Sequence, residues 1–158
     1  MKSRRVVVTG IGALTPIGNN LKDYWKALKA GVSGAAPITH FNAENFKTQF
    51  ACEVKGFEVT DFIHRKEARK LDKFSQYAMV VADEAFTDSG LNVDKIDSDR
   101  AGVIWGSGIG GMQTFYNESV NFGSGNGMPR FNPFFIPKLI SDIPAGHISI
   151  KYNFIFIF

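Results

Sequence analysis

The chain has little cysteine, little histidine and no long apolar run, and each scarcity excludes a class of protein. Cys52 is the single cysteine, so no internal disulfide can form, and we expect a protein of the reducing cytoplasm. The three histidines, His40, His64 and His147, lie too far apart for the spacing of a zinc site. No apolar stretch approaches the roughly 20 residues that cross a bilayer. We therefore expect neither a metal site nor a membrane partner.

The residues that are present have ordinary globular proportions. A length of 158 residues, with 44% hydrophobic and 21% charged residues, suits one domain or part of one. The net charge of +3 suits an acidic partner but does not indicate nucleic acid. Residues 1–18 imitate a secretion signal, with basic residues before apolar ones. Because Thr9, Gly10 and Pro16 interrupt the apolar run, we interpret its start as a first strand.

Short β-branched runs alternate with helical patterns along the chain. Residues 5–9 and 101–105 are nearly continuous apolar runs, which are typical of strands buried on both faces of a sheet. Helical spacing of apolar residues recurs in three segments, residues 20–30, 72–89 and 112–121. Residues 129–137 hold too much proline for regular structure, and residues 138–152 predict a helix bent near Pro144 and Gly146. The pattern predicts an α/β chain.

The loop after the second strand raises the hypothesis of a dinucleotide site, and hence of an oxidoreductase. Gly106, Gly108 and Gly111 match G-x-G-x-x-G between a strand and a helix, where backbone amides can hold a pyrophosphate. The acidic residue expected about 20 positions later is missing. The loop over residues 10–18 also lacks the required glycine spacing. The alternative is that these glycines allow a sharp turn and close packing.

Four segments, taken together and in this order, resemble one family. They are VVVTGIGALTPIGN, RKEARKLDKFSQYAMVVADEAFTDSGL, GVIWGSGIGG, and PFFIP followed by AGHISIKY. The chain resembles the β-ketoacyl-acyl-carrier-protein synthases, most closely the type II condensing enzymes of bacterial fatty acid synthesis. The resemblance implies an α/β thiolase-like fold, truncated within its N-terminal half, and a homodimer that needs no cofactor. It also implies an acyltransferase that condenses malonyl-carrier protein, with loss of carbon dioxide, with an acyl thioester.

The resemblance covers about residues 3–152, and residues 153–158 differ from the family. It places the nucleophilic cysteine and two catalytic histidines beyond the last residue of this chain. We therefore expect residues 1–158 to be a partial N-terminal domain with an aberrant tail, no catalytic residues and no activity of its own. The alternative is a catalytically dead partner that binds the carrier protein or another synthase chain. We also expect a marginal or insoluble product, with the face from Phe74 to Phe86 uncovered.

Three further assignments concern single positions. Cys52 lies in QFACEVKGF, an apolar stretch without a neighbouring basic residue or helix start, so we predict a buried structural cysteine. From the sequence alone, the simplest interpretation of Ile109 and Phe135 is that both are core residues like their apolar neighbours. The resemblance implies instead that Ile109 gates the acyl pocket and that Phe135 reaches the acyl chain across the dimer interface. Both are substrate-binding candidates.

The last candidates lie in a basic segment, HRKEARKLDK. Its cations recur at spacings of three and four, which predicts one basic face on a helix; they are Arg65, Lys66, Arg69, Lys70 and Lys73. The resemblance implies docking of the acidic acyl carrier protein, with Lys66, Arg69, Lys70 and Arg130 as candidates. Glu67 and Asp72 dilute this basic patch but do not cancel it. The alternative is a solvated charged face.

Overall fold

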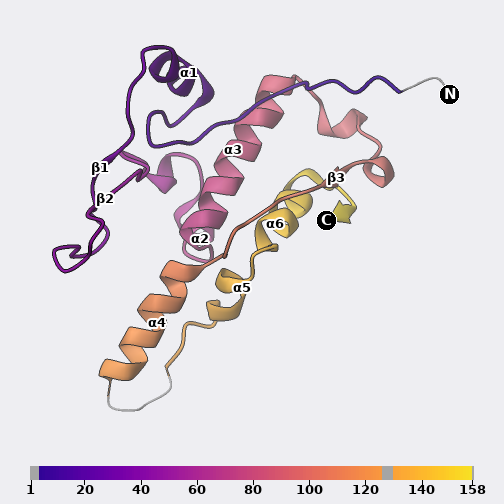
Figure 1. Ribbon diagram of the computed structural model, residues 1–158. Coiled ribbons are helices and arrows are strands. Elements are labelled where there is room, and N and C mark those ends of the chain that lie inside the picture. The colour runs from indigo at the N-terminus through magenta and orange to yellow at the C-terminus, as the bar shows by residue number, and fades with distance from the viewer. Residues whose placement is uncertain (1–3, 126–129, 158) are drawn as a thin grey trace. The chain divides into compact units, whose positions relative to one another are not determined.

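The computed structural model describes residues 4–125 and 130–157, in which helices are joined by long connections and the strands are very short (Figure 1). The chain divides into two compact units. The first unit combines residues 1–58 with residues 83–90, and the second combines residues 59–82 with residues 91–158.

The first unit holds α1 (Leu21–Lys29), a small antiparallel ribbon and the last turns of α3 (Lys73–Ser89). The side chain of Asn20 caps α1 by accepting a hydrogen bond from the Asp23 amide at 2.8 Å. The ribbon pairs β1 (Ala36–Pro37) with β2 (Phe50–Ala51). The helix predicted over residues 20–30 is confirmed.

Acidic side chains of α3 hold the loop before α1. One carboxylate, that of Glu84, accepts hydrogen bonds from the amides of Ala13 and Leu21, each at 2.7 Å. The carboxylate of Asp88 accepts a third from the Ile11 amide at 3.0 Å. A Cβ at Gly10 would lie 2.1 Å from the Ala85 carbonyl oxygen, so this glycine allows close packing of two backbones.

The second unit contains the remaining elements. They are η1 (Val59–Asp61), α2 (Arg65–Ala68), the first turns of α3, η2 (Val93–Lys95), η3 (Ser98–Arg100), β3 (Gly102–Val103), α4 (Met112–Ser124), α5 (Phe135–Leu139), α6 (Ile143–Tyr152) and β4 (Phe156–Ile157). A buried cluster of Val103, Ala145 and Ile148 joins β3 to α6, and Met79 of α3 packs against it. Figure 1 shows β3 running beside α6.

Strands are shorter in the structure than the sequence predicts. The prediction of a strand over residues 5–9 is wrong, because this extended segment pairs with no described neighbour and leaves Val6 91% exposed. The strand expected over residues 101–105 is shorter in the structure, where only β3 is paired. Its partner β4 pairs with it at two positions. A strand needs a neighbour for its backbone hydrogen bonds, and an apolar run by itself does not supply one.

Helices follow the predicted pattern except around the prolines. α3 and α4 occupy their expected segments, and Phe74 and Phe86 of α3 are half-buried rather than uncovered. The irregular structure predicted over residues 129–137 is partly wrong within residues 130–137, because Pro137 lies in the first turn of α5, where its missing amide hydrogen is not needed. Residue 129 lies outside the described residues. The bend expected at Pro144 and Gly146 is also wrong, since α6 runs through both residues and the break precedes it.

The last described residues pair with the second unit. β4 lies parallel to β3, with Phe156 opposite Gly102 and Ile157 opposite Val103. The Ile155 amide donates to the Ser98 carbonyl oxygen at 3.4 Å. Asn153 ends α6 in the left-handed region, with φ of 54°, and begins the turn toward β4. Most of the predicted tail therefore has a place in this unit, and residue 158 lies outside the described residues.

Candidate functional site

The glycine loop between β3 and α4 packs against the end of α5. The Gly111 amide donates a hydrogen bond to the Leu139 carbonyl oxygen at 3.1 Å. A Cβ at Gly111 would lie 1.9 Å from the Lys138 carbonyl oxygen, and Gly110 adopts φ of +92°. Both glycines therefore serve close packing and a turn. Because the Gly111 amide already has an acceptor, the geometry favours this interpretation over the dinucleotide hypothesis.

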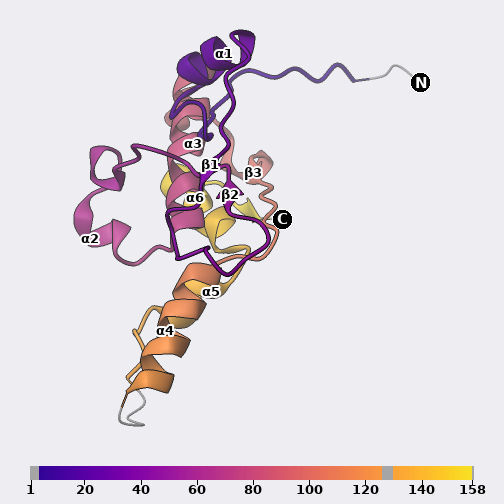
Figure 2. The same ribbon diagram turned by 60° about the vertical axis from the view of Figure 1, so that its left-hand side comes forward.

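Ile109 and Phe135 lie on the two partners of this contact but differ in exposure. Ile109 projects from the glycine loop and is 70% exposed. Phe135 begins α5 and is half-buried, with its ring stacked on that of Phe131 at 5.3 Å. Phe131 stacks in turn on Phe122 of α4 at 5.5 Å, so three aromatic rings join two helices that lie side by side in Figures 1 and 2. Phe135 is partly held by this stack, whereas the side chain of Ile109 is open to solvent.

The basic segment does not form one helix, so the prediction of a single helix over it is wrong. α2 ends at Ala68, residues 69–72 form a turn, and α3 begins at Lys73. The Asp72 carboxylate accepts a hydrogen bond from the Phe74 amide at 3.3 Å, which starts a new helix at this point. The cations therefore divide between α2, the turn and the first residue of α3.

The four docking candidates differ in their surroundings. Lys66, Arg69 and Arg130 are exposed. Lys70 donates to the two carboxylate oxygens of Glu67 at 2.8 and 3.0 Å, and this hydrogen bond lowers the pKa of Glu67 below its ordinary value. Lys70 is thus partly neutralised before any partner arrives.

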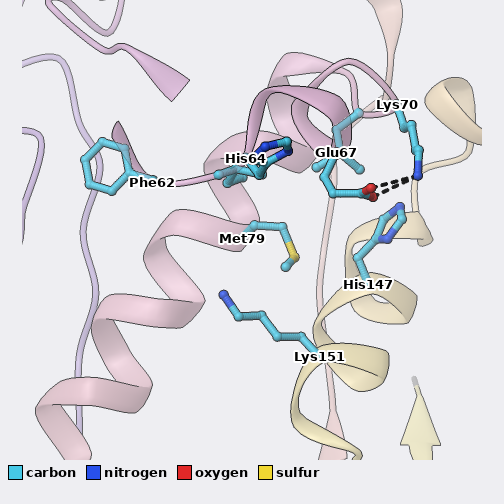
Figure 3. Close-up of a pocket in the computed structure, with 9 residues that line it drawn as sticks. Phe62, His64, Glu67, Lys70, Met79, His147 and Lys151 are labelled. Carbon is cyan, nitrogen blue, oxygen red and sulfur yellow. Dashed lines mark hydrogen bonds and ion pairs between the residues drawn. The ribbon is translucent and has the colours of Figure 1, made fainter. Parts of the chain in front are cut away.

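A cavity of about 270 Å³ opens beside the basic segment within the second unit. Its polar lining residues come from two segments and are His64, Glu67, Lys70, His147 and Lys151. Figure 3 shows the His147 ring beside the Glu67–Lys70 pair, whereas the Lys151 side chain extends away from His147 toward α3. Burial lowers the pKa of His147; Glu67 acts against this shift and Lys70 adds to it. This cavity was not predicted from the sequence. The four-residue spacing of His147 and Lys151 on one helix face was its only local signal.

Asp72 is a buried structural residue rather than a member of a solvated face. It is 6% exposed, and its carboxylate accepts hydrogen bonds from the amide and the hydroxyl of Thr114 at the start of α4. The interpretation that Asp72 dilutes a surface patch is wrong. An aspartate directly before a long helix was the available signal for a capping role.

Cys52 is exposed, so the prediction of a buried cysteine is wrong. It follows β2 in a ribbon of two strands, which leaves side chains open to solvent. Over residues 4–125 and 130–157, no group of three or more His, Cys, Asp or Glu residues is placed to hold a metal ion. Within the same ranges, no helix combines the length and apolarity that a membrane span requires.

Known proteins match nearly the whole chain. The family model "Beta-ketoacyl synthase, N-terminal domain" matches residues 3–155. A curated relative from Coxiella burnetii, 3-oxoacyl-[acyl-carrier-protein] synthase 2, is 44% identical over 153 residues, which are 97% of this chain and 37% of the relative. The chain thus spans little more than a third of that relative's length.

Two solved structures share the fold. The ishigamide ketosynthase/chain length factor aligns with a TM-score of 0.85 and 29% identity, over 98% of this chain and 40% of that chain. A second structure is described as a type II PKS acyl-carrier protein in complex with its ketosynthase bound to the hexaketide. A chain of that structure aligns with a TM-score of 0.73 and 26% identity, over 96% of this chain and 40% of that chain. The shared fold is the N-terminal part of the thiolase-like α/β architecture.

Proposed function

The chain belongs to the β-ketoacyl synthase family, and on this premise we propose that it is the N-terminal part of a 3-oxoacyl-[acyl-carrier-protein] synthase of the cytoplasm. The observation that supports this most strongly is 44% identity to a synthase of that name over 97% of the chain. The reaction is the condensation of malonyl-carrier protein, with loss of carbon dioxide, with an acyl thioester.

The chemistry needs groups that this chain does not assemble. A thiolate must take the acyl group, and hydrogen-bond donors must stabilise the enolate oxygen that forms when carbon dioxide leaves. Cys52 lies exposed next to the β1–β2 ribbon, and we assign no catalytic residue among residues 1–158. We propose that the chain supplies binding surfaces and that condensation requires residues outside it.

Two residues are proposed to contact the acyl chain. Ile109 is exposed on a loop whose ends are fixed by β3 and by the Gly111 contact, so its side chain can move without moving the strand. Phe135 is proposed to reach the substrate from α5 at a homodimer interface. The stack with Phe131 supports a fixed ring position for this role.

Acyl carrier protein is the proposed macromolecular partner. One structural neighbour is a type II PKS acyl-carrier protein in complex with its ketosynthase, and exposed basic side chains suit an acidic protein. Lys66, Arg69 and Arg130 are exposed and carry the proposal. Lys70 contributes less, because Glu67 already accepts its hydrogen bonds.

The test is binding of fluorescently labelled acyl carrier protein, measured by anisotropy. The double variant Lys66→Glu/Arg69→Glu should weaken binding about tenfold and flatten its salt dependence, because screened charge pairs are lost. The matched control is Lys26→Glu/Lys29→Glu on α1, which removes the same charge elsewhere. If both double variants lost the same affinity for acyl carrier protein, the loss would follow from net charge alone, and specific docking would be refuted. Condensation or carbon dioxide release by this chain alone would refute the proposal that catalysis requires residues outside it.

A further inference from the structure

One docking candidate, Lys70, is engaged with an acceptor of its own chain. Its ammonium group donates to both carboxylate oxygens of Glu67, at 2.8 and 3.0 Å. Glu67 lies on α2, and Lys70 lies three residues later in the turn that follows. Lys70 is half-buried, whereas Lys66 and Arg69, just before it, are exposed. The charge of Lys70 is therefore less available to an acidic partner than the charges of its neighbours.

The Lys70–Glu67 pair is open enough to water to be rearranged. The side chains of Lys70 and Glu67 are 43% and 61% exposed. An exposed ion pair of this kind shifts an equilibrium by about fivefold at most, because water screens both charges and two long side chains must be held in one geometry. A further charge placed beside the pair is therefore sufficient to change how often the hydrogen bonds are made.

His147 of α6 is the titratable group beside this pair. Figure 3 shows its ring next to Glu67 and Lys70, with which it lines the cavity of about 270 Å³. The ring is half-buried, and two residues close to it on α6, Ala145 and Ile148, belong to the buried cluster of the second unit. Because the core holds this stretch of α6, the imidazole stays near the pair rather than moving into solvent.

The surroundings of His147 are known from each element that packs against it. The charged or titratable side chains that line the cavity with it are His64, Glu67 and Lys70 from the α2 segment and Lys151 from α6. The Lys151 side chain extends away from His147 toward α3, and the lining residue from α3 is the uncharged Met79. β3 and β4, which also contact α6, contain no titratable residue. The Lys70–Glu67 pair is therefore the charged neighbour of the ring in Figure 3.

The protonation state of His147 depends on burial and on this pair. Burial lowers the pKa of His147, while the Glu67 carboxylate raises it and the Lys70 ammonium lowers it. The imidazole is therefore largely neutral at pH 7 and takes up a proton below about pH 6.5. In the reverse direction, the charge of His147 acts on the Glu67 carboxylate and lowers its pKa, after the larger effect of the Lys70 hydrogen bond.

We propose that Lys70 is a conditional docking residue, held by Glu67 while His147 is neutral and released toward an acidic partner when His147 is protonated. The imidazolium attracts the Glu67 carboxylate and repels the Lys70 ammonium, so both effects weaken the same hydrogen bonds. The identity of the partner rests on the proposed docking of acyl carrier protein. Affinity for that protein therefore rises as pH falls through the pKa of His147.

The coupling is tested without a partner, by following the imidazole resonances of His147 in NMR spectra of the full chain between pH 8 and 5. Glu67→Gln should lower the pKa of His147, because an attractive charge is lost, and Lys70→Gln should raise it, because a repulsive charge is lost. Lys73→Gln removes the same charge from a residue outside the cavity lining and should leave that pKa unchanged. The same pKa in wild type, Glu67→Gln and Lys70→Gln would overturn the proposal.

The release of Lys70 is tested by the anisotropy of labelled acyl carrier protein at pH 7.5 and 5.5. The ratio of the two dissociation constants should be about threefold larger for the wild type than for His147→Gln or Lys70→Gln, which is the scale of one exposed ion pair. Titration of the carrier protein itself is common to all variants and cancels in this comparison. His64→Gln changes the other imidazole of the cavity and should keep the wild-type ratio.

The outcomes separate this inference from the docking proposal. A wild-type ratio in His147→Gln or Lys70→Gln, or its loss in His64→Gln, would overturn the release of Lys70 by His147. If the NMR titrations show the expected coupling but acyl carrier protein binds at neither pH, the docking proposal is refuted and the coupling of His147 to the Lys70–Glu67 pair is supported.

Discussion

Asp72 and Thr114 are 42 residues apart in the sequence, and both the amide and the hydroxyl of Thr114 donate to the buried Asp72 carboxylate. The contact joins the start of α3 to the start of α4. Because the glycine loop leads directly into α4, Asp72 also fixes one end of the loop that carries Ile109. A single carboxylate thereby connects the basic segment to the proposed substrate loop within the second unit.

Loss of this contact should destabilise the chain measurably. Asp72→Ala leaves the Thr114 donors and the Phe74 amide without their acceptor, which costs about 1–3 kcal/mol of unfolding free energy. Thr114→Val removes the hydroxyl alone and should cost less. Urea unfolding of both single variants and of the double variant measures the coupling between them. Strictly additive effects would show that the two side chains do not interact.

Gly111→Ala should be much more costly than Gly106→Ala. A Cβ at Gly111 would lie 1.9 Å from the Lys138 carbonyl oxygen, whereas a Cβ at Gly106 meets no atom within 4 Å. We expect a loss of about 1–3 kcal/mol for Gly111→Ala and little change for Gly106→Ala. The midpoints of urea unfolding compare the two variants. Equal urea midpoints for Gly111→Ala and Gly106→Ala would contradict the packing role of Gly111.

His147 should make stability depend on pH. Burial lowers its pKa in the folded state below the ordinary value of 6.5, so the unfolded chain binds a proton more readily. The unfolding free energy contributed by this group is complete above about pH 6.5 and falls as pH drops through the folded pKa. Melting temperatures between pH 8 and pH 5 measure the slope, and His147→Gln should reduce it. If His147→Gln left the pH dependence of the melting temperature unchanged, groups other than His147 would be responsible for it.

Exposed apolar side chains should make the chain associate. Val8, Ile104 and Ile150 are 80%, 81% and 81% exposed. Each large apolar side chain gains about 1.5–3 kcal/mol on burial, which favours contact with another molecule. We expect light scattering of the purified chain to show concentration-dependent association, reduced by Val8→Lys/Ile150→Lys. A monodisperse monomer at tens of micromolar, the range in which exposed surfaces promote aggregation, would contradict this expectation.

Local features of the sequence predicted much of the helical structure. Asn20 marks the start of α1, and Gly90, with φ of +64°, follows the end of α3. The ordered motifs also identified the family, because several specific segments in one order carry far more information than one glycine pattern. These features succeed because capping, periodicity and turn residues act within a few positions of the chain.

Contacts between distant segments determined the rest. The sequence alone did not show that Asp72 would meet Thr114, that Cys52 would be exposed, or that residues 5–9 would pair with no described strand. Nor did the sequence show that His147 and Lys151 of α6 would line one cavity with Glu67 and Lys70. Periodicity reports which side of an element is apolar, but not which other element covers that side. Burial and pairing are set by tertiary packing, because they depend on atoms that lie far away along the chain.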